Sequence, residues 1–188
     1  MNEQGIYDRV AAIVNRPRTT VSAWLALADC AVKECGQASA PLRDLLLLAD
    51  ASALRDQLDR LFSAEPLPPQ VNALYFGLFD AIDRNRSERA LTGFYVCGAS
   101  NYTPGDADAF SDPIYYPKGR YLASAVLDSV RNLSYSDQPH AHFYNYAVTL
   151  CAAALLARQA MSGLLPHLQL VAGFDEGDIL DIARGAGA

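Results

Sequence analysis

Two stretches in the middle of the chain decide the fold class: Leu74-Tyr75-Phe76-Gly77-Leu78-Phe79 and Leu91-Thr92-Gly93-Phe94-Tyr95-Val96-Cys97. Both stretches are rich in aromatic and β-branched residues, which are enriched in β-strands. The polar residues 83–88 lie between them and have the composition of a connecting loop. We therefore expect a β-hairpin with a long connection.

The N-terminal residues 1–65 follow a different pattern, because their apolar positions recur at the spacing of an α-helix. One helix is expected over residues 20–35, and Gly36 ends it. A second helical pattern covers residues 41–62, either as one long helix or as two helices joined near Asp50. The front of the chain is therefore predicted to be helical.

Three prolines, Pro66, Pro68 and Pro69, separate this helical front from the remainder of the chain. A connection this short joins parts of one domain more often than two domains, so one domain of residues 1–188 is expected. The part after the prolines, residues 70–184, reads as mixed α and β structure. Beyond the hairpin it is expected to contain a structured loop at 101–119, helices at 121–133 and 142–161, a strand at 168–173, and a final strand or helical turn at 178–183.

Together these elements predict an α+β fold, with a helical N-terminal part, an antiparallel β-hairpin and short C-terminal strands packed against helices. The expected topology is a sheet of antiparallel strands covered by helices on one face. A chain of 188 residues with 51% hydrophobic residues is long and apolar enough to bury one such core.

The charge of the chain limits the classes of partner. Its net charge is −6 and its only lysines are Lys33 and Lys118, whereas binding to nucleic acid requires clustered basic side chains. An acidic balance is compatible with a basic protein partner, although many cytosolic proteins are acidic for solubility alone. No apolar run approaches the roughly 20 residues of a membrane span, and the first residues do not resemble a secretion signal. We expect a cytoplasmic protein that binds neither nucleic acid nor membrane.

The four cysteines are Cys30, Cys35, Cys97 and Cys151, and none belongs to a Cys-x-x-Cys pair. This pattern favours reduced thiols over a disulfide framework or a zinc site. A nucleophilic Cys151 with a histidine as base stays open, although a buried helical cysteine is the simpler interpretation.

Two histidines near residue 140 are candidate metal ligands. His140 and His142 could share a divalent metal with Asp137 if the chain were extended there. However, Pro139 suits the start of a helix, in which the two imidazole rings diverge.

The acidic loop resembles a calcium loop only in composition. Asp106, Asp108 and Asp112 lack the spacing of the twelve-residue motif and its final glutamate, so turn and capping roles are expected. Gly173-Phe174-Asp175-Glu176-Gly177 lacks the lysine and the hydroxyl residue of a phosphate-binding loop, and no Gly-x-Ser-x-Gly elbow occurs. No catalytic residue, metal ligand or cofactor is therefore predicted.

Six aromatic residues gather around the loop that follows the hairpin: Tyr95, Tyr102, Phe110, Tyr115, Tyr116 and Tyr121. Rigid aromatic rings with a polar tip supply contact area at a small cost in entropy, which suits a protein interface. The other interpretation is that these rings pin the loop to the sheet. We predict a partner-binding surface formed by Tyr102, Asp106, Asp108, Tyr115, Tyr116 and Arg120.

Five short motifs are spread over the last two thirds of the chain: Leu74-Tyr75-Phe76-Gly77-Leu78-Phe79-Asp80, Phe94-Tyr95-Val96-Cys97-Gly98, Pro113-Ile114-Tyr115-Tyr116-Pro117, Gly119-Arg120-Tyr121 and Gly173-Phe174-Asp175-Glu176-Gly177-Asp178. Together they resemble small bacterial immunity-type proteins, which are encoded beside polymorphic or contact-dependent toxins. The resemblance implies a protein that neutralises a cognate toxin by direct binding and has no chemistry of its own. The alternative is a small hydrolase or metal-dependent enzyme that uses His140, His142 and the acidic loop.

Overall fold

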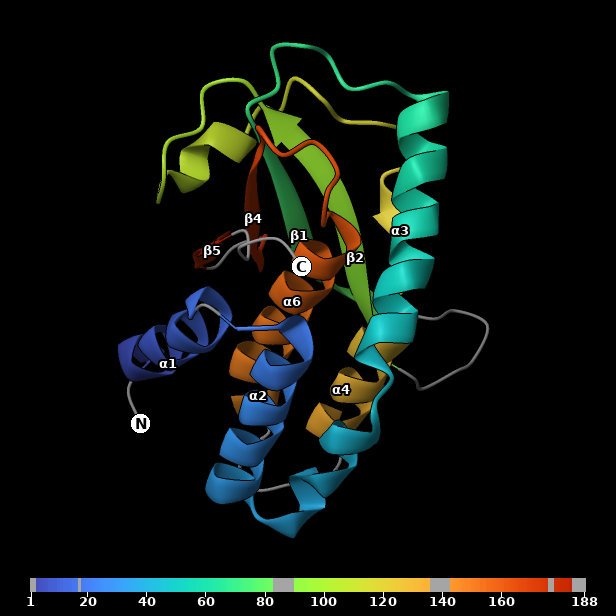
Figure 1. Ribbon diagram of the computed structural model, residues 1–188. Coiled ribbons are helices and arrows are strands. Elements are labelled where there is room, and N and C mark those ends of the chain that lie inside the picture. Colours follow the sequence, from blue (N-terminus) through green and yellow to red (C-terminus); the bar gives the residue numbers. More distant parts are fainter. Residues whose placement is uncertain (1–2, 17, 83–89, 136–142, 176–177, 184–188) are drawn as a thin grey trace.

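The computed structural model describes residues 3–16, 18–82, 90–135, 143–175 and 178–183, which form helices and a five-stranded sheet (Figure 1). This architecture confirms the α+β class. The helices are α1 (Glu3–Asn15), α2 (Thr20–Cys35), α3 (Leu47–Ala64), α4 (Ala125–Tyr135) and α6 (Thr149–Ala160), with 3-10 turns η1 (Gln37–Asp44) and η2 (Ala107–Phe110) and a π-helical turn η3 (Tyr144–Val148). The strands are β1 (Ala73–Ile82), β2 (Ala90–Ala99), β3 (Tyr121–Leu122), β4 (Gln169–Phe174) and β5 (Ile179–Ile182).

The sheet has the strand order β3-β2-β1-β4-β5. β1 and β2 form the predicted antiparallel hairpin, with Ala73 opposite Ala99 and Ile82 opposite Ala90. The expectation of a wholly antiparallel sheet is wrong, because β4 runs parallel to β1. A parallel neighbour requires a long crossover connection, and the chain between β1 and β4 supplies one that includes α4 and α6.

Helix α6 lies at the centre of the core. Every residue from Thr149 to Ala160 is buried except Gln159, which is partly buried. The small side chains of residues 152–154 let neighbouring elements approach closely on all sides of this helix. It packs against α1, α2 and α3 and against β1 and β4, so the apolar core extends without a break from Val10 in α1 to Ile182 in β5.

The predicted helices form with shifted boundaries. The break in the 41–62 pattern falls at Leu45 and Leu46 rather than at Asp50, because residues 37–44 form the 3-10 turn η1 before α3 begins. The indole N–H of Trp24 donates to the carbonyl of Leu42 at 3.0 Å and fastens η1 to α2. The helix expected from residue 121 begins only at Ala125.

Among the described residues, no helix combines the length and the hydropathy that crossing a membrane requires.

The four thiols should separate into two reactivity classes. All four cysteines carry thiols rather than disulfides; Cys97 and Cys151 are buried, and Cys30 and Cys35 are partly exposed. Burial raises the pKa of Cys97 to about 12 and also raises the pKa of Cys151, and the thiolate is the reactive form. Thiol titration of the native protein should therefore label Cys30 and Cys35 first, and the other two only after unfolding. Rapid labelling of Cys97 or Cys151 would contradict their burial.

Candidate functional site

One face of the sheet packs against helices, and the opposite face carries a continuous row of aromatic side chains. Successive ring centroids in this row lie 4.9–6.0 Å apart, which is the separation of interacting aromatic pairs. We call this row the aromatic face; in order across the sheet it consists of Tyr102, Phe110, Tyr75, Tyr95, Phe79 and Tyr121. Each ring therefore contacts the next one in the row, and these contacts fix the positions of the rings on the sheet.

Two glycines of the hairpin leave room for rings to lie against the sheet. In the strand register, Gly77 is opposite Tyr95 and Gly93 is opposite Phe79. A Cβ atom at Gly77 would lie 2.2 Å from the ring of Tyr95, and one at Gly93 would lie 2.3 Å from the ring of Phe79. Each ring therefore crosses the backbone of the neighbouring strand and covers a position that has no side chain.

The loop around η2 covers one end of the aromatic face. Phe110 stacks on Tyr75 with ring centroids 4.9 Å apart, and Tyr102 is only 4% exposed. The hydroxyl of Tyr102 donates to Asp181 at 2.5 Å, and its backbone N–H donates to the side chain of Asn72 at 3.1 Å. Tyr102, one of the predicted partner contacts, therefore pins the loop to the sheet.

The other end of the aromatic face is exposed at the β3 edge. Tyr116 and Tyr121 are 56% and 58% exposed. The guanidinium of Arg120 lies between them, 3.9 Å from the ring centroid of Tyr116 and 4.5 Å from that of Tyr121. It also donates to the hydroxyl of Tyr121 at 3.0 Å. We call these three residues the tyrosine–arginine stack.

Helix α3 and Glu65, the residue that follows it, hold residues 116–121, the segment that carries this stack. Figure 1 shows β3 beside this helix. The Glu65 carboxylate accepts hydrogen bonds from the backbone N–H groups of Lys118 and Gly119, both at 2.9 Å. The side-chain amide of Gln57 donates to the carbonyl of Ala123 at 3.0 Å and accepts from its N–H at 2.9 Å. These bonds flank residues 120–121 on both sides and fix the stack in place before any partner arrives.

A second side chain of α3 anchors the start of α4. The Asp50 carboxylate accepts the hydroxyl of Ser124 at 2.5 Å and the N–H groups of Ala125 and Val126 at 3.0 and 3.2 Å. A carboxylate in this position satisfies N–H groups of the first helical turn and favours the positive end of the helix dipole. The helix therefore begins at residue 125, which leaves Tyr121 in an edge strand.

The hydrogen bonds that Lys118 and Gly119 donate to the Glu65 carboxylate should be lost at acidic pH. The pKa of the Glu65 carboxyl lies below its ordinary value of 4.5, chiefly because Gly119 and then Lys118 donate backbone hydrogen bonds to the carboxylate. With a lowered folded-state pKa, this stabilisation is present above pH 4.5 and is lost as pH falls through the lower folded-state value. The amide NMR signals of Lys118 and Gly119 should shift with that acid transition. Glu65→Gln should remove the transition, and its persistence in the variant would contradict this role.

The remaining predicted contacts lie in different settings. Tyr115 is buried, and its hydroxyl donates to the carbonyl of Glu65 at 2.8 Å, so it ties the segment to the end of α3. Asp106 is partly buried just before η2, and Asp108 lies exposed within η2. Of the six predicted residues, the structure brings Tyr116 and Arg120 together on an exposed surface and places the two aspartates near the opposite end of the aromatic face.

Three tyrosine hydroxyls meet aspartates of the β4–β5 region. Tyr95 donates to Asp175 at 2.6 Å, Tyr102 donates to Asp181, and Tyr146 donates to Asp178. Burial, followed by the hydrogen bond to Asp175, raises the pKa of Tyr95 well above its ordinary value. Tyr95 therefore remains a protonated donor, which holds the Asp175 carboxylate at the rim of the aromatic face.

The structure describes only part of the alternative enzyme site. His140, His142 and Asp137 lie outside the described residues. Among the residues that are described, no group of three His, Cys, Asp or Glu side chains could hold a metal ion. Cys151 is buried in α6, where burial favours its unreactive thiol form.

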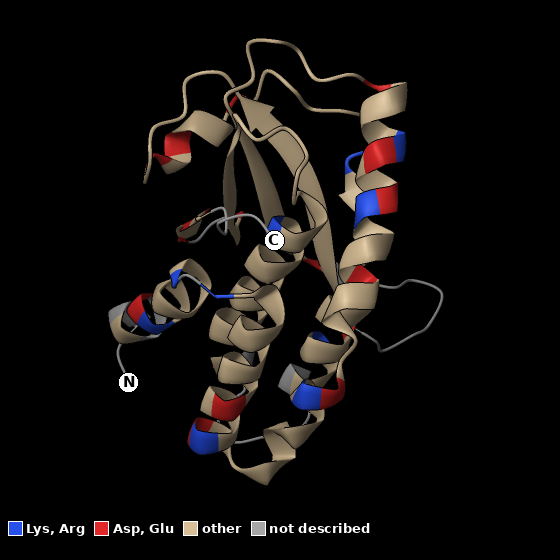
Figure 2. Cartoon of the chain, viewed as in Figure 1, with Lys and Arg blue, Asp and Glu red and all other residues tan. Residues whose placement is uncertain are grey.

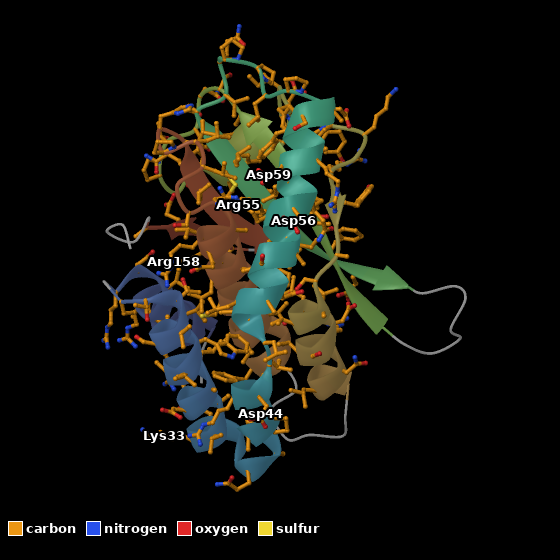
Figure 3. All side chains as sticks on the ribbon, turned by 45° about the vertical axis from the view of Figure 1, so that its right-hand side comes forward. Lys33, Asp44, Arg55, Asp56, Asp59 and Arg158 are labelled. Carbon is orange, nitrogen blue, oxygen red and sulfur yellow. The ribbon has the colours of Figure 1, made fainter. Side chains whose placement is uncertain are left out.

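An open hollow on the surface of α3 does not have the features of a catalytic pocket. Its lining residues are Asp59, Arg60, Ser63 and Ala64. Figure 3 shows Arg55, Asp56 and Asp59 along this helix, and Arg55 and Asp59 form an ion pair at 3.6 Å. Because one helix supplies the whole lining, the hollow lacks the convergent groups from several elements that are typical of catalytic pockets.

No family model, curated protein or solved structure matches this chain. The aromatic face and the tyrosine–arginine stack are therefore the features of the molecule from which we infer a function.

Proposed function

We propose that the protein binds another protein through the exposed part of the aromatic face and the tyrosine–arginine stack. The observation that carries this proposal is the stack itself, in which Arg120 lies between two tyrosines that are each more than half exposed. Tyrosine and arginine are enriched among the residues that dominate binding energy at protein interfaces. Because α3 already orders the segment, binding has a smaller entropic cost.

The charge of the molecule favours a protein over a nucleic acid as the partner. Exposed aromatic rings on a sheet can also stack with the bases of a single strand. However, such sites need a positively charged groove for the phosphates, whereas the net charge here is −6 and Asp175 lies beside Tyr95 on this face. The aromatic face therefore suits a protein surface better.

The partner that we propose is a toxin encoded beside this protein, which binding neutralises. The motif resemblance to immunity-type proteins supports this choice. Binding alone accounts for the function, so no catalytic group is needed. We place the complex in the cytoplasm, where the four thiols of this protein would remain reduced.

The test is to express the protein together with the product of the gene next to its own. We expect a stable complex by gel filtration and calorimetry, and relief of any growth defect that the neighbouring product causes alone. Leu46→Ala serves as a control variant. Leu46 is 75% exposed and directly precedes α3, whereas Glu65 follows the other end of this helix. The control variant should behave as the unmodified protein.

Two results would contradict the proposal. One is the absence of both complex and growth relief when the two proteins are soluble. The other is tight binding of a labelled single-stranded oligonucleotide at physiological salt, which would assign the aromatic face to nucleic acid instead.

A further inference from the structure

The aromatic face has an acidic end that no cation of the described residues neutralises. Asp175 and Asp181 each accept the hydroxyl of a tyrosine of this face, and neither takes part in an ion pair with a described residue. η2, at the same end, adds Asp108, and Figure 2 shows acidic colour without basic colour on this turn. The acidic end is thus complementary to a positively charged surface.

Asp175 is the carboxylate that lies beside the partly exposed ring of Tyr95. It is exposed, and its Oδ1 accepts the hydroxyl of Tyr95, while no described residue donates to Oδ2. The ring of Tyr95 lies over Gly77, so its other side is turned away from the sheet. A ring and a carboxylate therefore meet at one partly exposed position.

The protein already shows how a cation fits beside tyrosines of this surface. At the β3 end, the guanidinium of Arg120 stacks on Tyr116 and Tyr121. Tyr95 is less exposed than these two tyrosines, but it has no cation over its ring among the described residues and has the Asp175 carboxylate beside it instead. A planar guanidinium can stack on a ring and pair with a carboxylate through the same group, which an ammonium does less well.

We propose that the aromatic face takes an arginine side chain of a basic protein partner, which stacks on Tyr95 and pairs with the carboxylate of Asp175. This inference rests on the proposed function and adds the chemistry of the partner: a surface with exposed arginine and net positive charge at the contact. Asp181 of β5 and Asp108 of η2, toward the Tyr102 end of the same face, add negative charge that attracts such a surface.

The experiment uses two short probes and does not need the partner. The peptide N-acetyl-Gly-Arg-Gly-amide is titrated into the full-length protein at 150 mM salt, a condition chosen to screen general attraction (about 8 Å screening length). Its counterpart carries citrulline, a neutral isostere of arginine. NMR shifts of Tyr95 and Asp175 report on binding. We expect saturable shifts with the arginine peptide and at least about threefold weaker binding of the citrulline peptide, as expected for an exposed ion pair.

Variants then locate the contact. Asp175→Asn removes the charge but keeps an oxygen that accepts the Tyr95 hydroxyl, so the ring stays in place. It should weaken binding of the arginine peptide by about the same factor as the citrulline exchange. Asp56→Asn, which removes an exposed carboxylate of α3 (Figure 3), should leave binding unchanged.

Equal binding of the two peptides would overturn the inference, as would shifts centred elsewhere or an unaffected Asp175→Asn variant. These outcomes differ from failure of the proposed function. A neighbouring gene product that forms no complex would refute the toxin partner while the peptide titration still reports on the arginine position, and a complex without arginine binding would refute the arginine position alone.

Discussion

Replacing Tyr116 or Tyr121 by alanine should weaken binding to the partner by about 2 kcal/mol each, the cost typical of an interface anchor. This corresponds to roughly a thirtyfold rise in Kd. Each substitution removes an exposed ring and one side of the stack around Arg120. Calorimetry with the purified partner measures the change, and circular dichroism melting shows whether the variant is folded.

Tyr115→Ala is the contrasting variant. Tyr115 is next to Tyr116 in sequence but buried, with its ring 6.4 Å from that of Phe62. Its loss should lower the melting temperature, and any loss of binding should follow from disorder of the segment. If Tyr116→Ala and Tyr121→Ala are folded and bind with unchanged affinity, the interface lies elsewhere on the molecule.

Replacing Gly77 by alanine should reduce the free energy of unfolding by about 1–3 kcal/mol, the usual cost of overpacking. The new Cβ would lie 2.2 Å from the ring of Tyr95. That ring cannot move freely, because its hydroxyl is bonded to Asp175 and its neighbours Tyr75 and Phe79 lie on either side. Urea denaturation measures the loss.

A double-mutant cycle identifies the cause of this loss. In a Tyr95→Leu background the ring is absent, so Gly77→Ala should cost much less than in the unmodified protein. An equal cost in both backgrounds would mean that the glycine matters for some reason other than the crossing ring.

Local patterns predicted the hairpin and the helical front, because both depend on residues close in sequence. Aromatic and β-branched residues mark β1 and β2, and helical periodicity marks α2 and α3. The parallel position of β4 was not predictable in this way, since the pairing of Leu74 with Leu170 joins residues far apart in the chain. The strand β3 was missed because two residues are too short to show a period.

The residues predicted from the sequence lie in and around the candidate site, but the sequence could not tell which of them are exposed. Tyr115 and Tyr116 are chemically identical neighbours, yet one faces the core and the other faces solvent. The proline-rich loop has no alternating pattern from which this difference could be inferred. The contacts that order the stack come from Gln57 and Glu65, which precede their partners by more than fifty residues.

Part of the aromatic face could nevertheless have been predicted from the sequences of the two hairpin strands. Tyr75, Gly77 and Phe79 alternate along β1 and must share a face. Gly93 and Tyr95 alternate in the same way along β2, and antiparallel pairing places each glycine opposite an aromatic residue. The alternation is hard to recognise because the residues on the other face of both strands are also apolar, so each strand is hydrophobic along its whole length.

Hydroxyl-radical footprinting of the protein, alone and in complex with the neighbouring gene product, tests the proposed interface most directly. Tyr116 and Tyr121 are exposed in the free protein, so both should be oxidised readily. In the complex, their oxidation should fall sharply, while the exposed Leu46 and Leu48 should be oxidised as before. If the oxidation of both tyrosines is unchanged and the exposed Val21 and Leu25 of α2 are protected instead, the partner binds the N-terminal helices. That result would contradict the proposed interface.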